Sequence, residues 1–141
     1  IKLNMVVLKG INDKEIKKMI EIARENDAVL QLIELINTDD EFYKEHYFNL
    51  KEIEKELEKK AIIVIKKDMH NRRQYDLGDV MIEIVRPFTK DFCENCTRLR
   101  VTSDGRIKPC LMRNDNLIDF KDKCSLIEAI KEKGVLYVQA N

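Results

Sequence analysis

The chain has 141 residues, of which 44% are apolar and 37% charged, with 26 basic and 26 acidic side chains. This apolar content excludes a disordered chain, and the balanced charge argues against a general polyanion binder. The longest run of apolar residues, Ala61–Ile65, is far too short to span a membrane. We therefore expect a soluble, globular and cytoplasmic protein.

The first third of the chain predicts a parallel α/β unit. Ile1–Leu8 is nearly continuous in apolar residues and predicts a buried strand. Asn12 and Glu15 have the spacing of a capping box, which predicts that a helix begins there, and Ala28–Ile36 predicts a second buried strand. A strand, helix and strand joined by short links form a βαβ unit with parallel strands. Because a domain rarely opens on its own core strand, we expect a missing N-terminal portion to pack beside Ile1–Leu8.

The remainder predicts shorter elements. Asn37–Asn49 indicates a loop with some helix, and Leu50–Lys60 a charged helix that starts after Asn49. Three short strands are then predicted at Ile62–Lys66, Gln74–Leu77 and Val80–Arg86. A last helix is expected to start at Ser125 and to end at Gly134. We place a boundary near residue 60, between a parallel α/β part (1–60) and a small region of short antiparallel strands (61–141).

Basic residues gather between positions 86 and 113, although the whole chain carries no net charge. This segment holds seven basic side chains, five of them arginines, against three acidic ones. The planar guanidinium group suits phosphate oxygens and purine edges. Arg98 and Arg100 are two residues apart on one expected strand, so both side chains should leave from the same face.

Three cysteines lie in the same segment, and a predicted hairpin brings them together. Cys93 and Cys96 have a C-x2-C spacing, which places two thiolates within reach of one metal centre. Asp104–Gly105 predicts a two-residue turn, and pairing outward from it sets Leu99 opposite Cys110. Opposed residues on such a ribbon are roughly 5 Å apart, so Cys110 should return beside Cys96. We expect a cluster of three thiolates near the arginine pair.

The spacing leaves the identity of this cysteine site open. Cys124 follows Cys110 by the same interval that separates Cys110 from Cys96, so it could complete a four-thiolate zinc site. It could equally be an ordinary buried thiol. Spacing alone does not separate a structural or nucleic-acid-binding zinc module from an iron–sulfur site, or from a chain without metal.

Several motifs in order resemble one known family. Cys93-x2-Cys96-x13-Cys110, with Thr97–Arg100 and Ser103–Leu111, resembles the C-terminal signature of the radical S-adenosylmethionine GTP 3′,8-cyclases of molybdenum-cofactor biosynthesis. Lys2–Asn4, Lys9–Asp13 and Ile33–Glu34 match the same family in order and spacing. The resemblance covers essentially the whole chain, which would then be the C-terminal half of such an enzyme.

This resemblance implies a fold, a reaction and a set of contacts. Residues 1–60 would be the C-terminal part of an incomplete (β/α) barrel, and residues 61–141 would carry a second [4Fe-4S] cluster. The implied enzyme, a lyase, converts GTP to (8S)-3′,8-cyclo-7,8-dihydroguanosine 5′-triphosphate with S-adenosylmethionine and a further [4Fe-4S] cluster. Cys93, Cys96 and Cys110 would hold the second cluster, with one iron left open for the guanine. The implied GTP contacts are Lys2, Arg98, Leu99 and Arg100, and the implied S-adenosylmethionine contacts are Asn4 and Ile36.

The chain also departs from the family pattern. It lacks the first-cluster motif of three cysteines spaced x3 and x2, so we expect no turnover without the N-terminal half as partner. Gln31 stands where the family usually has an arginine that aids GTP binding, and Ile36 where a methionine usually lines the S-adenosylmethionine site. By the resemblance, Cys124 is a bystander.

Other polar residues have simpler interpretations. Lys2 and Asn4 share one strand face, which indicates either a position facing a ligand or an edge strand facing water. Arg72 and Arg73 are predicted to be surface charges, and we assign no role to His46 or His70. We expect no membrane or nucleic-acid partner, and the sequence leaves open whether the chain forms a homodimer.

Overall fold

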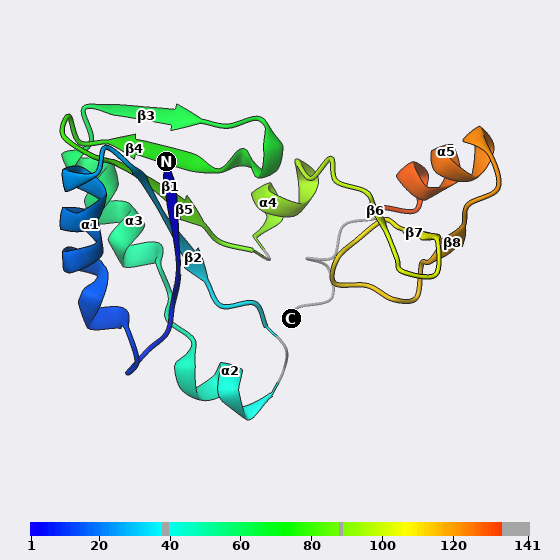
Figure 1. Ribbon diagram of the computed structural model, residues 1–141, viewed down its shortest axis with the longest axis horizontal. Helices are drawn as coiled ribbons and strands as arrows, with labels where there is room; N and C mark the ends of the chain where they lie inside the picture. Colours follow the sequence, from blue (N-terminus) through cyan, green and yellow to red (C-terminus); the bar gives the residue numbers. More distant parts are fainter. Residues whose placement is uncertain (38–39, 88, 134–141) are drawn as a thin grey trace.

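The computed structural model of the protein describes residues 1–37, 40–87 and 89–133. A large lobe built on a five-stranded sheet is joined to a small lobe built on a three-stranded sheet (Figure 1). In chain order the elements are β1 (Lys2–Val7), η1 (Asp13–Glu15), α1 (Ile16–Glu25), β2 (Val29–Glu34), α2 (Glu41–His46), α3 (Lys51–Lys60), β3 (Ile63–Lys66), η2 (Met69–Asn71), β4 (Arg73–Asp76), β5 (Met81–Val85), α4 (Lys90–Glu94), β6 (Arg100–Val101), β7 (Arg106–Lys108), β8 (Ile118–Asp119) and α5 (Lys123–Lys131).

The predicted βαβ unit is confirmed. Strands β1 and β2 are parallel, with Lys2 opposite Val29, and α1 connects them. The predicted capping box is wrong, because the side chain of Asn12 accepts a hydrogen bond from the Leu8 backbone N–H at 2.7 Å instead of capping a helix. The α-helix then begins at Ile16, after the short 3₁₀ turn η1. Asn12 therefore closes the loop after β1.

The sheet continues well past residue 60, in the order β1-β2-β5-β4-β3. Strand β5 joins β2 in parallel, and β4 and β3 follow as antiparallel neighbours. The short strands β3 to β5 thus belong to the same sheet as β1 and β2. The sequence analysis could not predict this, because pairing between distant strands leaves no mark in a local sequence pattern. The α/β class and the small antiparallel sheet are confirmed, while the barrel and the functional division near residue 60 stay predictions.

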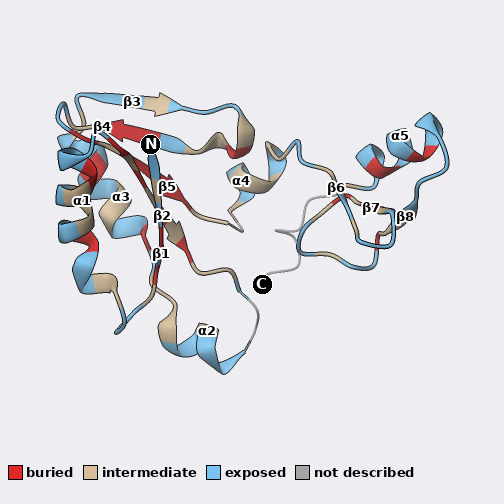
Figure 2. Ribbon diagram, in the orientation of Figure 1, coloured by how far each residue is buried: buried red, intermediate tan, exposed pale blue. Residues whose placement is uncertain are grey.

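Helices α1 and α3 cover one face of the large sheet, and the hydrophobic core lies beneath them (Figures 1 and 2). Ile16 and Ala23 of α1 and Leu57 of α3 are buried, together with Leu50 at the start of α3. They pack against buried strand residues, namely Met5, Val7, Leu30, Leu32, Tyr75, Ile82 and Ile84. Alternation along the strands sends the intervening side chains to the opposite face of the sheet.

That opposite face carries a row of polar side chains across four strands. The sheet register aligns Asn4 of β1 with Gln31 of β2, Glu83 of β5 and Gln74 of β4. Glu83 is almost fully buried, with a relative exposure of 1%. A buried carboxylate is stable only when it is paired, so Glu83 requires basic or hydrogen-bonding partners on this face of the sheet.

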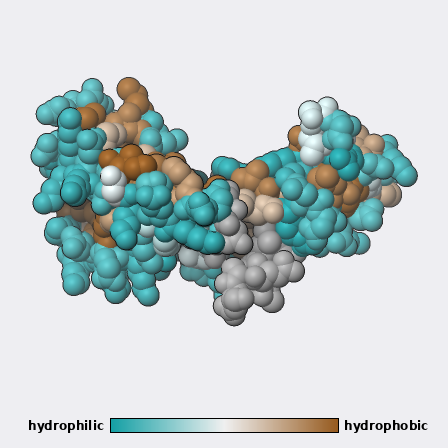
Figure 3. All heavy atoms as spheres, turned by 90° about the horizontal axis from the view of Figure 1, so that it is seen from below, coloured by the Kyte–Doolittle hydropathy of each residue, from teal (hydrophilic) through white to brown (hydrophobic). Residues whose placement is uncertain are grey.

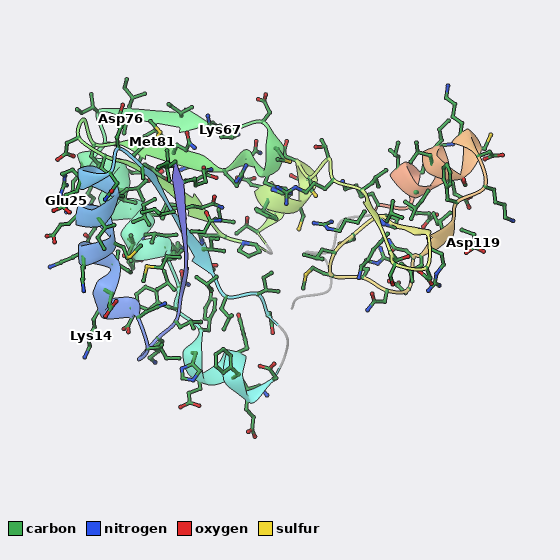
Figure 4. All side chains as sticks on the ribbon, viewed as in Figure 1. Lys14, Glu25, Lys67, Asp76, Met81 and Asp119 are labelled. Atoms are coloured by element: carbon green, nitrogen blue, oxygen red, sulfur yellow. The ribbon has the colours of Figure 1, made fainter. Side chains whose placement is uncertain are left out.

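The small lobe consists of β6, β7 and β8, with α5 packed beside them (Figure 1). Asp122 caps α5 in a reciprocal capping box with Ser125, so the helix starts earlier than the predicted Ser125. Gly134, the predicted end of this helix, lies outside the described residues. Asp119 of β8 stands in this lobe, far from Asp76 and Met81, which pair at one end of the large sheet (Figure 4).

The face of the molecule shown in Figure 3 is mainly hydrophilic, with apolar side chains gathered in patches on both lobes. Among the helices of the described residues, none combines the length and the apolar character needed to cross a membrane.

Candidate functional site

The ribbon formed by β6 and β7 differs from the predicted hairpin by one residue. Arg100 pairs with Lys108 and Val101 with Ile107, so the predicted register is wrong. The turn contains three residues, because the backbone N–H of Thr102 donates to the Arg106 carbonyl at 2.9 Å. Gly105 ends this turn with a φ of +85°, a conformation that favours glycine in three-residue hairpin loops.

This shift of one residue changes which side chains share a face. In the predicted register Cys110 lies opposite Leu99. The observed pairs end at Arg100 and Lys108, and beyond them Arg98, Arg100 and Cys110 all line one cavity. Leu99 instead lines a separate cavity of about 210 Å³ beside α5.

A cavity of about 220 Å³ lies where the small lobe meets the end of the large sheet. The sulfur-bearing residues Cys93, Cys96 and Cys110 all line it, as do the basic residues Arg98, Arg100 and Lys133. Lys133 also donates from Nζ to the Arg98 carbonyl at 2.9 Å. Apolar side chains from the sheet end and the loops that follow form the rest of its wall, among them Ile33, Ile36, Val85 and Pro87. Three thiols and three cations thus share one largely apolar cavity.

A short capped helix presents the first two cysteines. The Thr89 side chain accepts a hydrogen bond from the Phe92 N–H and caps α4, so Cys93 falls in its last turn. The helix ends at once, and the Cys96 N–H donates back to the Cys93 carbonyl at 3.2 Å. The side-chain amide of Asn95 donates to the Asp91 carbonyl at 3.0 Å and fixes this end. Both cysteines are therefore held on one tight turn.

Cysteine thiolates are the usual ligands of iron–sulfur clusters, and three of the four cysteines line this cavity. All three are half-buried, whereas Cys124 is exposed at the start of α5 and does not line the cavity. The alternative of a buried thiol at Cys124 is thus wrong. Within residues 1–37, 40–87 and 89–133, no three His, Cys, Asp or Glu side chains stand together as a set for one metal ion.

The other predicted contacts fall in two groups. Ile36 lines the cavity with Arg98 and Arg100, whereas Lys2, Asn4 and Leu99 are not among its described lining residues. Lys2 and Asn4 do share the polar face of the large sheet, where β1 is an edge strand. The Nζ atom of Lys2 donates to Oε2 of Glu83 at 2.7 Å.

Glu83 is the centre of a buried charge cluster that the sequence analysis missed. Its carboxylate also accepts from Gln74 Nε2 at 2.7 Å and forms an ion pair with Arg72 at 2.6 Å. Burial raises the pKa of Glu83, but the hydrogen bonds from Lys2 and Gln74 and the charge of Arg72 lower it by more, so the net shift is downward. The half-buried guanidinium of Arg72 is thus paired with the buried carboxylate of Glu83, and the prediction that Arg72 is a surface charge is wrong.

His70 is a further residue that the sequence analysis left without a role. It is buried and lines the same cavity as the three cysteines. Burial first, and then the nearby charges of Arg98 and Arg72, lower the pKa of His70 to about 4, so the imidazole is neutral near pH 7. A lone histidine in a polar segment carries no spacing signal that would reveal this position.

A known protein family matches the part of the chain that contains this cavity. The family model for Molybdenum Cofactor Synthesis C matches residues 28–133, which include all the cavity residues named above. The chain belongs to this family. Membership in the Molybdenum Cofactor Synthesis C family confirms the resemblance found in the sequence.

Similar curated proteins carry the name Probable GTP 3′,8-cyclase. The one from Methanothermobacter marburgensis is 43% identical over 152 residues, covering 97% of this chain and 50% of that protein. The one from Thermococcus kodakarensis is 46% identical over 129 residues, covering 85% of this chain and 42% of that protein. A third, from Pyrococcus horikoshii, is 47% identical over 128 residues, with 84% and 41% covered. The chain thus spans half, or less, of the length of these relatives.

Proposed function

We propose that this chain is the C-terminal half of a GTP 3′,8-cyclase of molybdenum-cofactor biosynthesis. Two observations on the relatives support the proposal: they bear this enzyme's name, and each is at least twice as long as the aligned chain. The intact enzyme would be a radical S-adenosylmethionine lyase that converts GTP to (8S)-3′,8-cyclo-7,8-dihydroguanosine 5′-triphosphate. Its N-terminal half would supply the S-adenosylmethionine-cleaving cluster.

The observation that carries the proposal is the shared cavity. Cys93, Cys96 and Cys110 would hold a second [4Fe-4S] cluster, which supplies an open iron coordination position when bound. Arg98 and Arg100 line the same cavity, so their guanidinium groups can pair with the phosphates or the purine edge of a nucleotide. These residues would bind and orient GTP, which is catalysis by positioning.

The chain's other residues would contribute in different ways. Apolar side chains such as Ile36 and Val85 keep water from one wall of the cavity. Lys2 and Asn4 lie on the polar sheet face, where they are available to a ligand that extends beyond the cavity. The 141 residues contain no second three-cysteine motif, so we expect the chain alone to give no turnover.

Oxygen-free reconstitution with iron and sulfide tests the proposal. Wild-type chain and Cys124→Ser should each retain about four irons, and Cys110→Ser should lose most of them. One tightly bound zinc that disappears in Cys124→Ser would contradict the proposal and support a zinc module. Cys124 is a matched control, since it is a cysteine of the same lobe outside the cavity.

A further inference from the structure

The turn η2, between β3 and β4, has an unusual backbone. His70 and Asn71 have φ values of +68° and +48°, in the left-handed region. This conformation is unfavourable for a residue with a Cβ, and it persists only where the surroundings determine it. The contacts of His70 therefore have to account for its position.

Two contacts tie His70 to the segment that carries the first two cysteines. Its ring stacks on Phe92, with centroids 3.9 Å apart and an interplanar angle of 14°. Its backbone N–H donates to the Asn95 carbonyl at 2.8 Å. Phe92 directly precedes Cys93, and Asn95 directly precedes Cys96. His70 thus contacts the residue before Cys93 and the residue before Cys96.

These contacts join the large lobe to the cysteine turn. Turn η2 is fixed to the large sheet, because Arg72 follows it directly and pairs with buried Glu83 at 2.6 Å. The helix α4, by contrast, is short and lies at the junction with the small lobe (Figure 1). His70 therefore connects an element tied to the large sheet with the short helix that carries Cys93, at the edge of the cavity that Cys93 and Cys96 line.

We infer that His70 is a positioning residue that holds the turn of Cys93 and Cys96 against the large sheet, so that both sulfurs face Cys110 across the cavity. The inference rests on the proposed function for its cluster. His70 acts through its ring stack on Phe92 and through the backbone bond to Asn95. It contacts the cysteine turn from the sheet side, whereas Cys110 arrives from the β6–β7 ribbon.

Two substitutions at position 70 distinguish the contribution of the ring stack from that of the backbone conformation. Asparagine tolerates the left-handed conformation but has no ring, so His70→Asn removes the stack without adding backbone strain. His70→Phe keeps an aromatic ring for stacking on Phe92. His46, on α2 and remote from the cavity, provides the control His46→Asn.

The first readout is amide hydrogen exchange over residues 92–96 in the metal-free 141-residue chain. We expect His70→Asn to speed exchange in this segment about tenfold, and His70→Phe and His46→Asn to leave it within about twofold of wild type. Unchanged exchange in His70→Asn would overturn the inference. Should His70→Asn fail to fold, Phe92→Leu removes the same stack from the other side, and the same increase is expected.

The second readout is iron retention after oxygen-free reconstitution. We expect His70→Asn to retain less than about half of the wild-type iron, with rescue by His70→Phe. Equal iron in wild type and His70→Asn would contradict the positioning role while leaving the proposed function intact. A wild-type chain without iron would instead contradict the proposed function, and the exchange measurement would still decide whether His70 holds the turn.

Discussion

Lys2 and Glu83 meet across an intervening strand: Nζ of Lys2 lies 2.7 Å from Oε2 of Glu83, although β2 separates β1 from β5 in the sheet. The Glu83 side chain is 1% exposed, and its carboxylate also forms an ion pair with Arg72 and accepts a hydrogen bond from Gln74. One buried anion thus organises two cations on the polar face of the sheet. This arrangement fixes the Lys2 side chain in place before any ligand arrives.

The first prediction concerns the stability of this cluster. Glu83→Gln keeps the shape of the side chain but leaves Lys2 and Arg72 without their counter-charge, so it should lower the free energy of unfolding by about 2 kcal/mol. Urea unfolding measures the change. The exposed pair Arg24–Asp79 offers a control, because Asp79→Asn should cost less than about 1 kcal/mol. Equal effects of the two substitutions would contradict a special role for Glu83.

The second prediction is a pH dependence. The pKa of Glu83 is lowered in the folded protein from its ordinary value of 4.5, so the ionised carboxylate stabilises the fold above that pH. This contribution should be lost as the pH falls below 4.5 and through the lower folded-state pKa. The difference in unfolding free energy between wild type and Glu83→Gln should therefore shrink from pH 6 to about pH 3. A difference that is constant over this range would contradict the ionised state of Glu83.

The third prediction tests the three-residue turn. A Cβ at Gly105 would meet nothing within 4 Å, so the cost of Gly105→Ala comes from its φ of +85° alone. We expect about 1 kcal/mol, seen as roughly fivefold faster amide exchange in β6 and β7. Gly105→Asn should cost less, because asparagine enters the left-handed region more readily. Identical exchange in all three proteins would contradict the observed turn.

The fourth prediction concerns the nucleotide. In the cluster-loaded chain, Arg98→Ala and Arg100→Ala should each weaken GTP binding by about 1–3 kcal/mol, the loss expected for a charged hydrogen bond. Calorimetric titration measures the affinity, with Arg24→Ala as a control on the surface of the large lobe. Leu99→Ala should leave the affinity within about threefold, because Leu99, unlike Arg100, is not among the described residues that line the cysteine cavity. Unchanged affinity in both arginine variants would exclude them as nucleotide contacts.

The elements of the fold were predictable where their signal is local. The nearly continuous apolar run of Ile1–Leu8 identified β1, and the short links predicted that β1 and β2 are parallel. The pairing of β5 with β2 was not predictable in this way. It depends on contacts between residues some fifty positions apart, such as Leu30 and Ile82, which no local period records.

The candidate site was predictable in composition but not in geometry. The spacing of Cys93 and Cys96 and the density of arginines pointed to the segment that lines the cavity, yet the predicted register of the β6–β7 ribbon is wrong by one residue. A change of one residue in turn length reverses the faces of a whole strand, so the error lies in the turn alone. Glu83 did carry a signal, since a carboxylate between Ile82 and Ile84 in a buried strand requires a partner. His70 carried none.

Electron paramagnetic resonance of the reduced, cluster-loaded chain tests the central claim most directly. If the nucleotide enters the cavity shared by Cys93, Cys96, Cys110 and the two arginines, saturating GTP should change the cluster spectrum. The same addition should change it far less in the Arg98→Ala, Arg100→Ala double variant. A spectrum that stays unaltered in the wild-type chain, while calorimetry shows GTP bound, would contradict the claim.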